Sequence, residues 1–209
     1  MYTLFSKPGW GSAIVELQFA WYGLPLAIED LEDPAKSATA RARLAPMNPL
    51  LQLPTLLLPN GAVMTESAAI TLHLADLDAR QSLVPPPGDL ARPAFLRWLV
   101  FVVANIYPTF TYADDPSRFV DNETAQPGFV TKVNAYEQRL WRMMEAAAGV
   151  PWFAGDKFTA LDIYVAVMTV WRPKRAWFAA ECSRLHSIAL ATEARPELRA
   201  VWQRNFPST

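Results

Sequence analysis

The sequence has little of the chemistry that builds disulfides, metal sites or nucleic-acid grooves. Cys182 is the single cysteine in 209 residues, which excludes an internal disulfide and favours a reducing, cytoplasmic compartment. The only two histidines, His73 and His186, have no partners at metal-ligand spacing, so we expect no metal. The 19 basic and 20 acidic residues give a formal net charge of −1 with no basic stripe, which argues against nucleic-acid binding.

We also expect no targeting segment and no membrane span. The stretch Met1–Lys7 lacks the charged start and apolar block of a signal peptide. The most apolar run, Trp98–Ala113, contains Asn105 and Pro108 and is shorter than the roughly 20 residues that a membrane span needs. We therefore expect a buried helix of a soluble protein and no membrane partner. With 52% hydrophobic and 19% charged residues, the chain can bury a substantial core.

The first eighty residues alternate between strand and helix patterns. The helix that starts at Ser12 is closed by Gly23, and Asp33-Pro34 has the pattern of an N-cap followed by proline at the first helical position. The predicted strands span 2–5, 26–31 and the two arms of a hairpin around Pro59-Asn60-Gly61, and the predicted helices span 12–22, 33–44 and 67–79. A βαβ start requires a partly parallel sheet covered by helices, which is a thioredoxin-like α/β layout.

The second half shows helix patterns and no convincing strand. Pro85-Pro86-Pro87-Gly88 marks a linker at 81–90, which separates a domain at 1–80 from an all-α domain at 91–209. A long apolar helix at 91–107 should bend or end near Pro108. A second predicted helix carries an apolar stripe that ends at Gly149. The stripe consists of Phe129, Val133, Tyr136, Leu140, Met143 and Ala147.

Thr159 and Asp162 form a capping-box pattern ahead of an apolar helix at 161–171. The Thr hydroxyl can accept from a first-turn N–H, and the Asp carboxylate can reach back to the cap. A carboxylate within an apolar helix also suits catalysis, but the pattern favours a structural cap.

Two short motifs carry the clearest indication of a ligand site. The first is Asn48-Pro49-x-x-Gln52-Leu53-Pro54-x-Leu56, in which Pro54 stands where a strand should begin. The second is Glu66-Ser67, at the start of the predicted third helix. Free backbone N–H groups, a hydroxyl and the positive end of the helix dipole converge there, which suits a carboxylate ligand. A plain hairpin followed by an ordinary serine cap is the alternative interpretation.

These two motifs together resemble the glutathione site of cytosolic glutathione transferases, and the domain order and capping box match the same family. The resemblance implies that Pro54 is cis and that the backbone of Leu53 pairs with the cysteinyl backbone of glutathione. It also implies that Ser67 holds the γ-glutamyl carboxylate. Gln52 and Glu66 would reach backbone or amino groups. Glutathione would then be the co-substrate.

The activating group for the thiol should lie between the first strand and the first helix. Here the sequence is similar to bacterial beta-class enzymes, which also carry Lys-Pro-Gly after this strand, but Ser6 replaces their tyrosine and Gly11 replaces their cysteine. A mixed disulfide through an enzyme cysteine is therefore not expected. Ser12 is the first candidate and Ser6 the second. Ser12 could instead only cap the helix, and backbone N–H groups near Gly9 and Gly11 could activate the thiol without a side chain.

Aromatic side chains are the candidates for an electrophile pocket. Trp10 stands on a loop between two glycines, where an indole is costly to expose unless it covers something. The other candidates are Tyr107, Phe110, Tyr112 and Trp171. For each of them an ordinary place in the core is the alternative, because the chain has 8 Trp, 11 Phe and 6 Tyr.

The sequence therefore leads to two hypotheses from different classes. The first is a cytoplasmic glutathione S-transferase that conjugates small hydrophobic electrophiles in detoxification, with glutathione-dependent isomerisation as a variant. The second is a glutathione-transferase-like binding or interaction protein with little catalysis, because the family's Tyr, Cys and Arg are missing between Ser6 and Ala13. A homodimer is expected from the resemblance alone.

Overall fold

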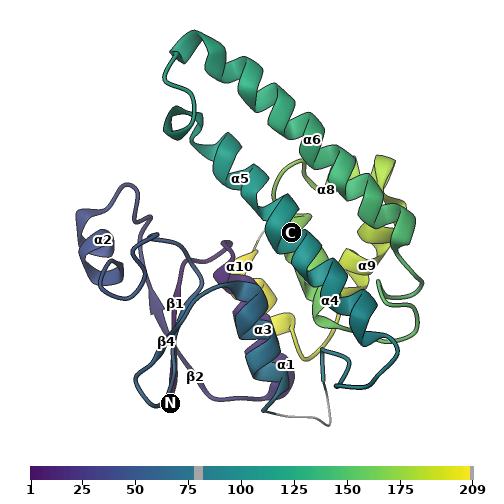
Figure 1. Cartoon of the computed structure of the whole chain (residues 1–209). Coiled ribbons are helices and arrows are strands. Elements are labelled where there is room, and N and C mark those ends of the chain that lie inside the picture. The colour runs from purple at the N-terminus through teal and green to yellow at the C-terminus, as the bar shows by residue number, and fades with distance from the viewer. Residues whose placement is uncertain (78–81, 208–209) are drawn as a thin grey trace. The chain divides into compact units, whose positions relative to one another are not determined.

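The computed structural model describes residues 1–77 and 82–207, which its contacts group into two compact units (Figure 1). The first unit comprises Met1–Pro86 and Ala191–Thr209, and the second comprises Pro87–Leu190. The sequence analysis places residues 191–209 with the helices, whereas the contacts place them with the sheet. The predicted helix end near residue 79 and the first residue of the predicted linker lie outside the described residues.

A four-stranded mixed sheet forms the centre of the first unit, in the order β2-β1-β3-β4. β1 runs parallel to β2 and antiparallel to β3, and β3 runs antiparallel to β4. The strands are β1 (Tyr2–Ser6), β2 (Leu26–Asp30), β3 (Thr55–Leu57) and β4 (Val63–Met64). The helices are α1 (Ser12–Tyr22), α2 (Ala38–Leu44), α3 (Ser67–Ala75) and α10 (Arg199–Asn205). The predicted thioredoxin-like layout is confirmed.

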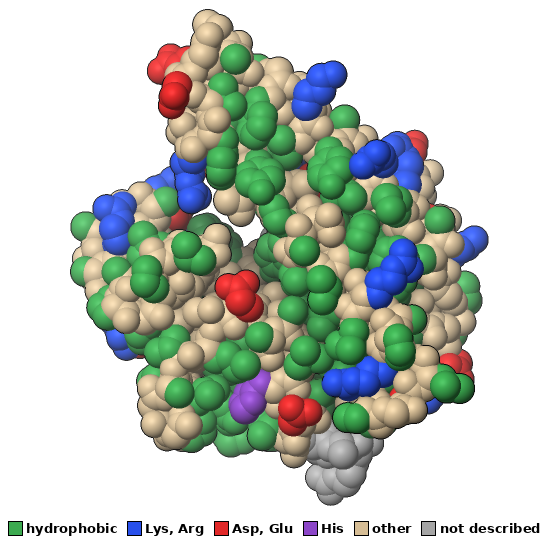
Figure 2. Space-filling model, in the orientation of Figure 1, with side chains coloured by type: hydrophobic (Ala, Val, Ile, Leu, Met, Phe, Trp, Pro, Cys, Tyr) green, Lys and Arg blue, Asp and Glu red, His purple; other side chains and the backbone are tan. Residues whose placement is uncertain are grey.

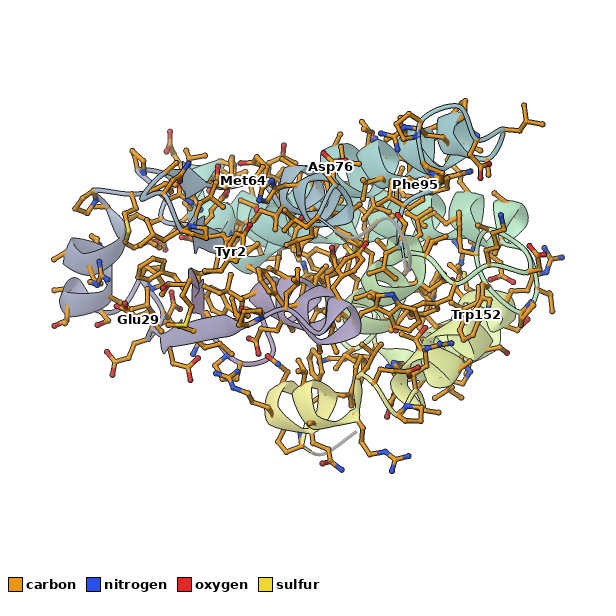
Figure 3. The ribbon with its side chains drawn as sticks, turned by 90° about the horizontal axis from the view of Figure 1, so that it is seen from below. Tyr2, Glu29, Met64, Asp76, Phe95 and Trp152 are labelled. Carbon is orange, nitrogen blue, oxygen red and sulfur yellow. The ribbon has the colours of Figure 1, made fainter. Side chains whose placement is uncertain are left out.

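Helix α1 is the core helix of this unit. Eight consecutive residues from Ser12 to Phe19 are buried, and the helix ends at Gly23, which has the left-handed φ of 62° that the stop pattern predicts. α1 contacts both α3 and α10. Figure 3 shows yellow α10 against purple α1, with Tyr2 and Glu29 labelled at the sheet.

The predicted start of α2 at Asp33-Pro34 is wrong. The Asp33 carboxylate accepts from the Ala35 N–H at 2.9 Å, which makes a turn that does not continue as a helix. The helix begins after Ser37, whose backbone is extended. The Ser37 hydroxyl caps α2 by accepting a hydrogen bond from the Ala40 N–H.

The second unit is helical in its described residues, apart from an isolated bridge between Trp152 and Gly155. α9 begins in this unit and was not predicted. The elements are α4 (Arg92–Phe101), η2 (Val102–Ile106), α5 (Tyr107–Asp114), η3 (Pro116–Arg118), η4 (Glu123–Ala125), α6 (Gln126–Ala147), α7 (Ala160–Met168), α8 (Arg175–Glu181) and α9 (Ser183–Glu193).

Pro108 neither ends nor breaks the long helix, which is continuous from Arg92 to Asp114. The five residues of η2 form a π-helical segment, in which the Tyr107 N–H donates to the Val102 carbonyl. This wider turn accommodates a proline that has no N–H to donate. The expectation that this run is too short for a membrane span is wrong, because the helix Arg92–Asp114 has 23 residues and the length and composition of such a span. Its most apolar window is 33% buried, and η2 and α5 pack against α6 (Figure 1).

The buried face of α6 differs from the predicted apolar stripe. Tyr136 and Met143 are 42% and 45% exposed. The buried residues are Glu137, Leu140, Trp141 and Met144. A buried carboxylate within this face could not be expected from an apolar pattern.

The capping box of α7 is confirmed. Asp162 accepts from the Thr159 N–H and from the Phe153 N–H, each at 2.7 Å. Burial raises the pKa of Asp162 to about 6, although these N–H groups favour the charged form. Asp162 thus joins the helix start to the preceding loop, as a structural residue.

Candidate functional site

Three candidate segments meet at one edge of the sheet. β1 and β4 both run antiparallel to β3, so the carboxyl ends of β1 and β4 lie beside the start of β3. The segments at this edge are therefore Ser6–Ser12 after β1, Gln52–Pro54 before β3 and Glu66–Ser67 after β4. An edge where parallel strands end and helices begin is a common ligand position in α/β folds.

The segment before β3 contains backbone hydrogen-bonding groups that have no partner among the described residues. The Leu53–Pro54 peptide bond is cis, as the resemblance implies. The Asn48 amide donates to the Gln52 carbonyl at 2.9 Å and to the Thr55 hydroxyl at 3.1 Å, which fixes the loop. The Leu53 N–H and carbonyl have no hydrogen-bond partner among the described residues. They are therefore free to pair with an extended peptide.

The segment after β4 presents an uncapped helix start. Glu66 is the N-cap of α3, with φ of 63°, and its side chain is exposed and makes no cap hydrogen bond. Ser67 follows at the first helical position and is 8% exposed. Its hydroxyl has no partner among the described residues. The first N–H groups of α3 are thus available to an anion.

The two candidate serines are both fully buried and both hydrogen-bonded. The Ser6 hydroxyl donates to Glu16 at 2.6 Å. The Ser12 Oγ accepts from the Lys7 N–H at 3.1 Å and lies 3.2 Å from the Lys7 carbonyl and 3.0 Å from the Ser6 Oγ. Ser12 is not the helix cap, because Gly11 occupies that position without a side-chain bond.

The start of α1 is therefore also uncapped. Trp10 and Ala13 close a turn through their N–H groups, whereas the N–H groups of Gly11 and Ser12 have no partner among the described residues. Such N–H groups and the helix dipole together attract negative charge. Both residues are buried, so these two unpartnered donors lie inside the loop and not on its surface.

The structure brings three of the five aromatic candidates together. Tyr107, Phe110 and Trp171 form a cluster in the second unit, with ring centroids 5.2 to 6.3 Å apart. Tyr112 is 39% exposed and packs against Phe119 instead. Burial, with a smaller effect of Tyr164, raises the pKa of Tyr107 well above its usual value, so this phenol keeps its proton.

Trp10 belongs to the first unit and lies in the loop after β1. The residue is 38% exposed, and the Lys7 ammonium lies over its ring at 5.4 Å from the centroid. Figure 2 shows Lys and Arg side chains scattered singly over one face of the molecule.

The sequence analysis did not identify the polar residues that support the candidate thiol loop, which is the segment Lys7–Gly11 between β1 and α1. Glu16 lies in α1 and accepts hydrogen bonds from Arg204 and Asn205, which lie in α10. The sequence feature that could have indicated this network is a glutamate within the apolar pattern of α1.

Cys182 is buried, and burial and Glu145 raise the pKa of its thiol to about 12, so it stays protonated. The described residues contain no group of three or more side chains suited to a metal.

Comparison with known proteins decides the family. The family model "Glutathione S-transferase, N-terminal domain" matches residues 12–77. An uncharacterized GST-like protein, YncG of Escherichia coli K12, is 37% identical over 209 residues and is covered to 98%, as is this chain. The chain belongs to the glutathione S-transferase family.

Solved structures of glutathione S-transferases match both the fold and the length of this family member. A glutathione transferase from Methylococcus capsulatus shares 25% identity with a TM-score of 0.77, over 97% of this chain and 98% of its own. A glutathione S-transferase from Methylobacterium radiotolerans, solved in complex with glutathione sulfonate, also shares 25% identity with a TM-score of 0.77, over 96% and 93%.

Proposed function

We propose that this chain binds glutathione and transfers its thiolate to small apolar electrophiles. The observation that supports this most is the open Leu53 backbone beside the uncapped start of α3 at Glu66 and Ser67. In the proposed complex the cysteinyl backbone of glutathione pairs with Leu53, next to cis-Pro54. The relative from Methylobacterium radiotolerans, solved in complex with glutathione sulfonate, supports the choice of ligand.

The γ-glutamyl end of glutathione supplies a carboxylate and an ammonium group for the start of α3. In the proposed site the carboxylate accepts from the Ser67 hydroxyl and the first N–H groups of α3. The ammonium group faces the Glu66 carboxylate, and Gln52, which is exposed, reaches a backbone group of the tripeptide.

Thiol activation in this proposal rests on backbone donors. A free thiol has a pKa of about 8.5, and only its thiolate attacks well. The N–H groups of Gly11 and Ser12 and the dipole of α1 would stabilise the thiolate. The sulfur then forms a bond to the electrophilic carbon, and the leaving group departs with its bonding electrons. The Ser6 and Ser12 hydroxyls stay engaged with Glu16 and Lys7.

The aromatic side chains support an apolar electrophile. Phe110 and Trp171 offer ring surfaces within the second unit, and Tyr107 packs against both with its phenol protonated. Trp10 and Tyr112 are partly exposed and complete the proposed set. A cytoplasmic homodimer that acts in detoxification is the corresponding expectation from the family.

Titration calorimetry with glutathione tests the binding site. We expect wild type to bind and the Glu66→Ala/Ser67→Ala double variant to lose binding while it remains folded. The matched control is Glu123→Ala/Ser183→Ala, a pair of exposed residues in the second unit, which should bind as wild type does. Binding retained in the first double variant would contradict the site.

The second candidate is a glutathione-binding protein with little catalysis. The engagement of both serine hydroxyls favours it, because no side-chain hydroxyl is then left for the thiol. A panel of electrophiles and isomerisation substrates distinguishes the candidates: normal glutathione binding without turnover would favour the second, and robust turnover would reject it.

A further inference from the structure

Glu16 is a buried carboxylate to which the proposed reaction gives no role. It lies in α1 and is 1% exposed. Its oxygens accept from the Ser6 hydroxyl at 2.6 Å, from Arg204 Nη1 at 3.3 and 3.2 Å, and from Asn205 Nδ2 at 3.1 Å. A buried carboxylate is tolerated only when donors compensate for its lost hydration. Two of its three partners come from α10, at the far end of the chain.

Arg204 joins two carboxylates at the edge of the sheet that carries the candidate site. While Nη1 binds both oxygens of Glu16, Nη2 binds both oxygens of Asp30, at 2.6 and 2.7 Å. Asp30 is the last residue of β2 and lies opposite Ser6 in the parallel register. The guanidinium therefore fixes the end of β2 to the middle of α1, directly behind the thiol loop.

Asn205 connects the same network to the loop itself. Its Nδ2 donates to Glu16 and to the Val201 carbonyl, and its Oδ1 accepts from the Gly9 N–H at 3.1 Å. Gly9 has a φ of +79°, and a Cβ there would lie 3.4 Å from the Asn205 carbonyl oxygen. The loop therefore approaches α10 closely and is held by a hydrogen bond across 196 positions of sequence.

Other hydrogen bonds of the loop are local. The Trp10 N–H donates to the Lys7 carbonyl at 3.0 Å, and Lys7 exchanges bonds with the Ser12 hydroxyl. These bonds close the turn on itself, but they do not fix its direction against the helix. The bond from Gly9 to Asn205 does so, and it sits two residues before Gly11.

We propose that Arg204 and Asn205 are positioning residues that hold the loop Lys7–Gly11 so that the Gly11 and Ser12 N–H groups face the thiol. This inference rests on the proposed function and adds that α10 sets the acidity of the bound thiol. Neither side chain touches glutathione in this arrangement: Asn205 acts through Gly9, and Arg204 acts through Glu16. Affinity for glutathione, which depends on Leu53 and Ser67, should be independent of both.

The test compares Asn205→Ala with Gln203→Ala, which removes an exposed amide from the same helix. Hydrogen exchange without ligand should be faster at residues 9 to 12 in Asn205→Ala alone. With glutathione bound, ultraviolet titration of the thiolate should give a thiol pKa about 0.5 to 1 unit higher, or a three- to tenfold smaller thiolate fraction at neutral pH. The dissociation constant for protonated glutathione should change less than about twofold.

Arg204 provides a second pair of variants. Arg204→Ala should reproduce the effect of Asn205→Ala, Arg204→Lys should restore part of it by keeping a cation beside Glu16, and the exposed Arg199→Ala should have no effect. Should Arg204→Ala fail to fold, the Asn205 pair still decides the matter.

Each outcome has a separate meaning. Unchanged exchange at residues 9 to 12 in Asn205→Ala overturns the inference, whether or not the protein binds glutathione. Faster exchange with an unchanged thiol pKa also overturns it, because the loop would then not present the activating donors. A wild type that binds no glutathione contradicts the proposed function instead, and the exchange comparison still shows whether α10 holds the loop.

Discussion

At the residue scale, Ser6 and Ser12 stand at the position of a thiol-activating hydroxyl, but their hydroxyls are bound to other groups of the protein. Both stand where a thiol-activating hydroxyl would be sought, between β1 and α1. Ser6 is nevertheless bound to Glu16, and Ser12 is bound on both sides to the Lys7 backbone. Because a hydroxyl has only one proton, a serine that donates its hydrogen bond to another group of the protein cannot donate one to a ligand. The same bonds shape the loop in which the Gly11 and Ser12 N–H groups have no partner among the described residues.

Ser12→Ala tests this separation. We expect kcat/KM for an accepted electrophile to fall less than about tenfold, because the backbone donors remain. The free energy of unfolding should fall by about 1–3 kcal/mol, because the Lys7 N–H loses its buried acceptor. Steady-state kinetics and urea unfolding measure the two effects, with Ser183→Ala, an exposed serine at the start of α9, as the control. A drop of more than about 100-fold in turnover at unchanged stability would assign activation to the hydroxyl.

At the element scale, features encoded within a few residues could be predicted from sequence. The end of α1 at Gly23, the capping box at Thr159 and the proline that precedes β3 all depend on adjacent residues. The start of α2 could not be predicted, because Asp33-Pro34 suits a turn as well as a helix cap.

The buried face of α6 could not be predicted because tertiary contacts select it. Trp141 packs on Phe178, and Glu137 accepts from Trp141 and pairs with Arg172 at 3.5 Å. Phe178 and Arg172 lie outside α6, so the apolar period of α6 alone gives a face rotated by one position. The candidate site divides in the same way. Local motifs indicate the Glu66-Ser67 pair and carry the family resemblance that implies the cis-proline, whereas the link from Gly9 to α10 is non-local.

The buried carboxyl of α6 gives a pH-dependent contribution to stability. Burial raises the pKa of Glu137 from 4.5 to about 7, against the opposing effects of Trp141 and Arg172. The folded protein therefore binds this proton more tightly than the unfolded chain. The resulting stabilisation is present below the unfolded pKa and is lost as the pH rises from about 4.5 to about 7.

Glu137→Gln should reduce this loss of stability, which urea unfolding at a series of pH values between about 4.5 and 8 measures. Part of the slope should remain, because Asp162, with its pKa raised to about 6, acts in the same direction. The control is Glu123→Gln, at an exposed position in η4, which should leave the profile unchanged. An identical slope in Glu137→Gln and wild type would contradict the assignment.

At the scale of the whole molecule, the C-terminal segment packs with the N-terminal sheet. The contacts of residues 191–209 group them with the sheet, so the first unit is assembled from both ends of the sequence. Trp202 and Phe206 are 3% and 7% exposed, and Arg204 compensates the buried Glu16 of α1. A unit built in this way cannot be complete until the last helix is in place, and its candidate thiol loop shares that dependence.

Deletion of residues 199–209 therefore removes more than a terminal helix. The loss of the buried aromatic side chains and of the partner of Glu16 should lower the free energy of unfolding of the first unit by at least about 4 kcal/mol. Deletion of residues 207–209, which begins at the exposed Pro207, is the matched control and should change stability by less than about 0.5 kcal/mol. Chemical unfolding followed by circular dichroism measures both. If the longer deletion unfolded at the same midpoint as the control, the sheet would be stable without α10, and the network that joins Arg204 to Glu16 could not be what supports the thiol loop.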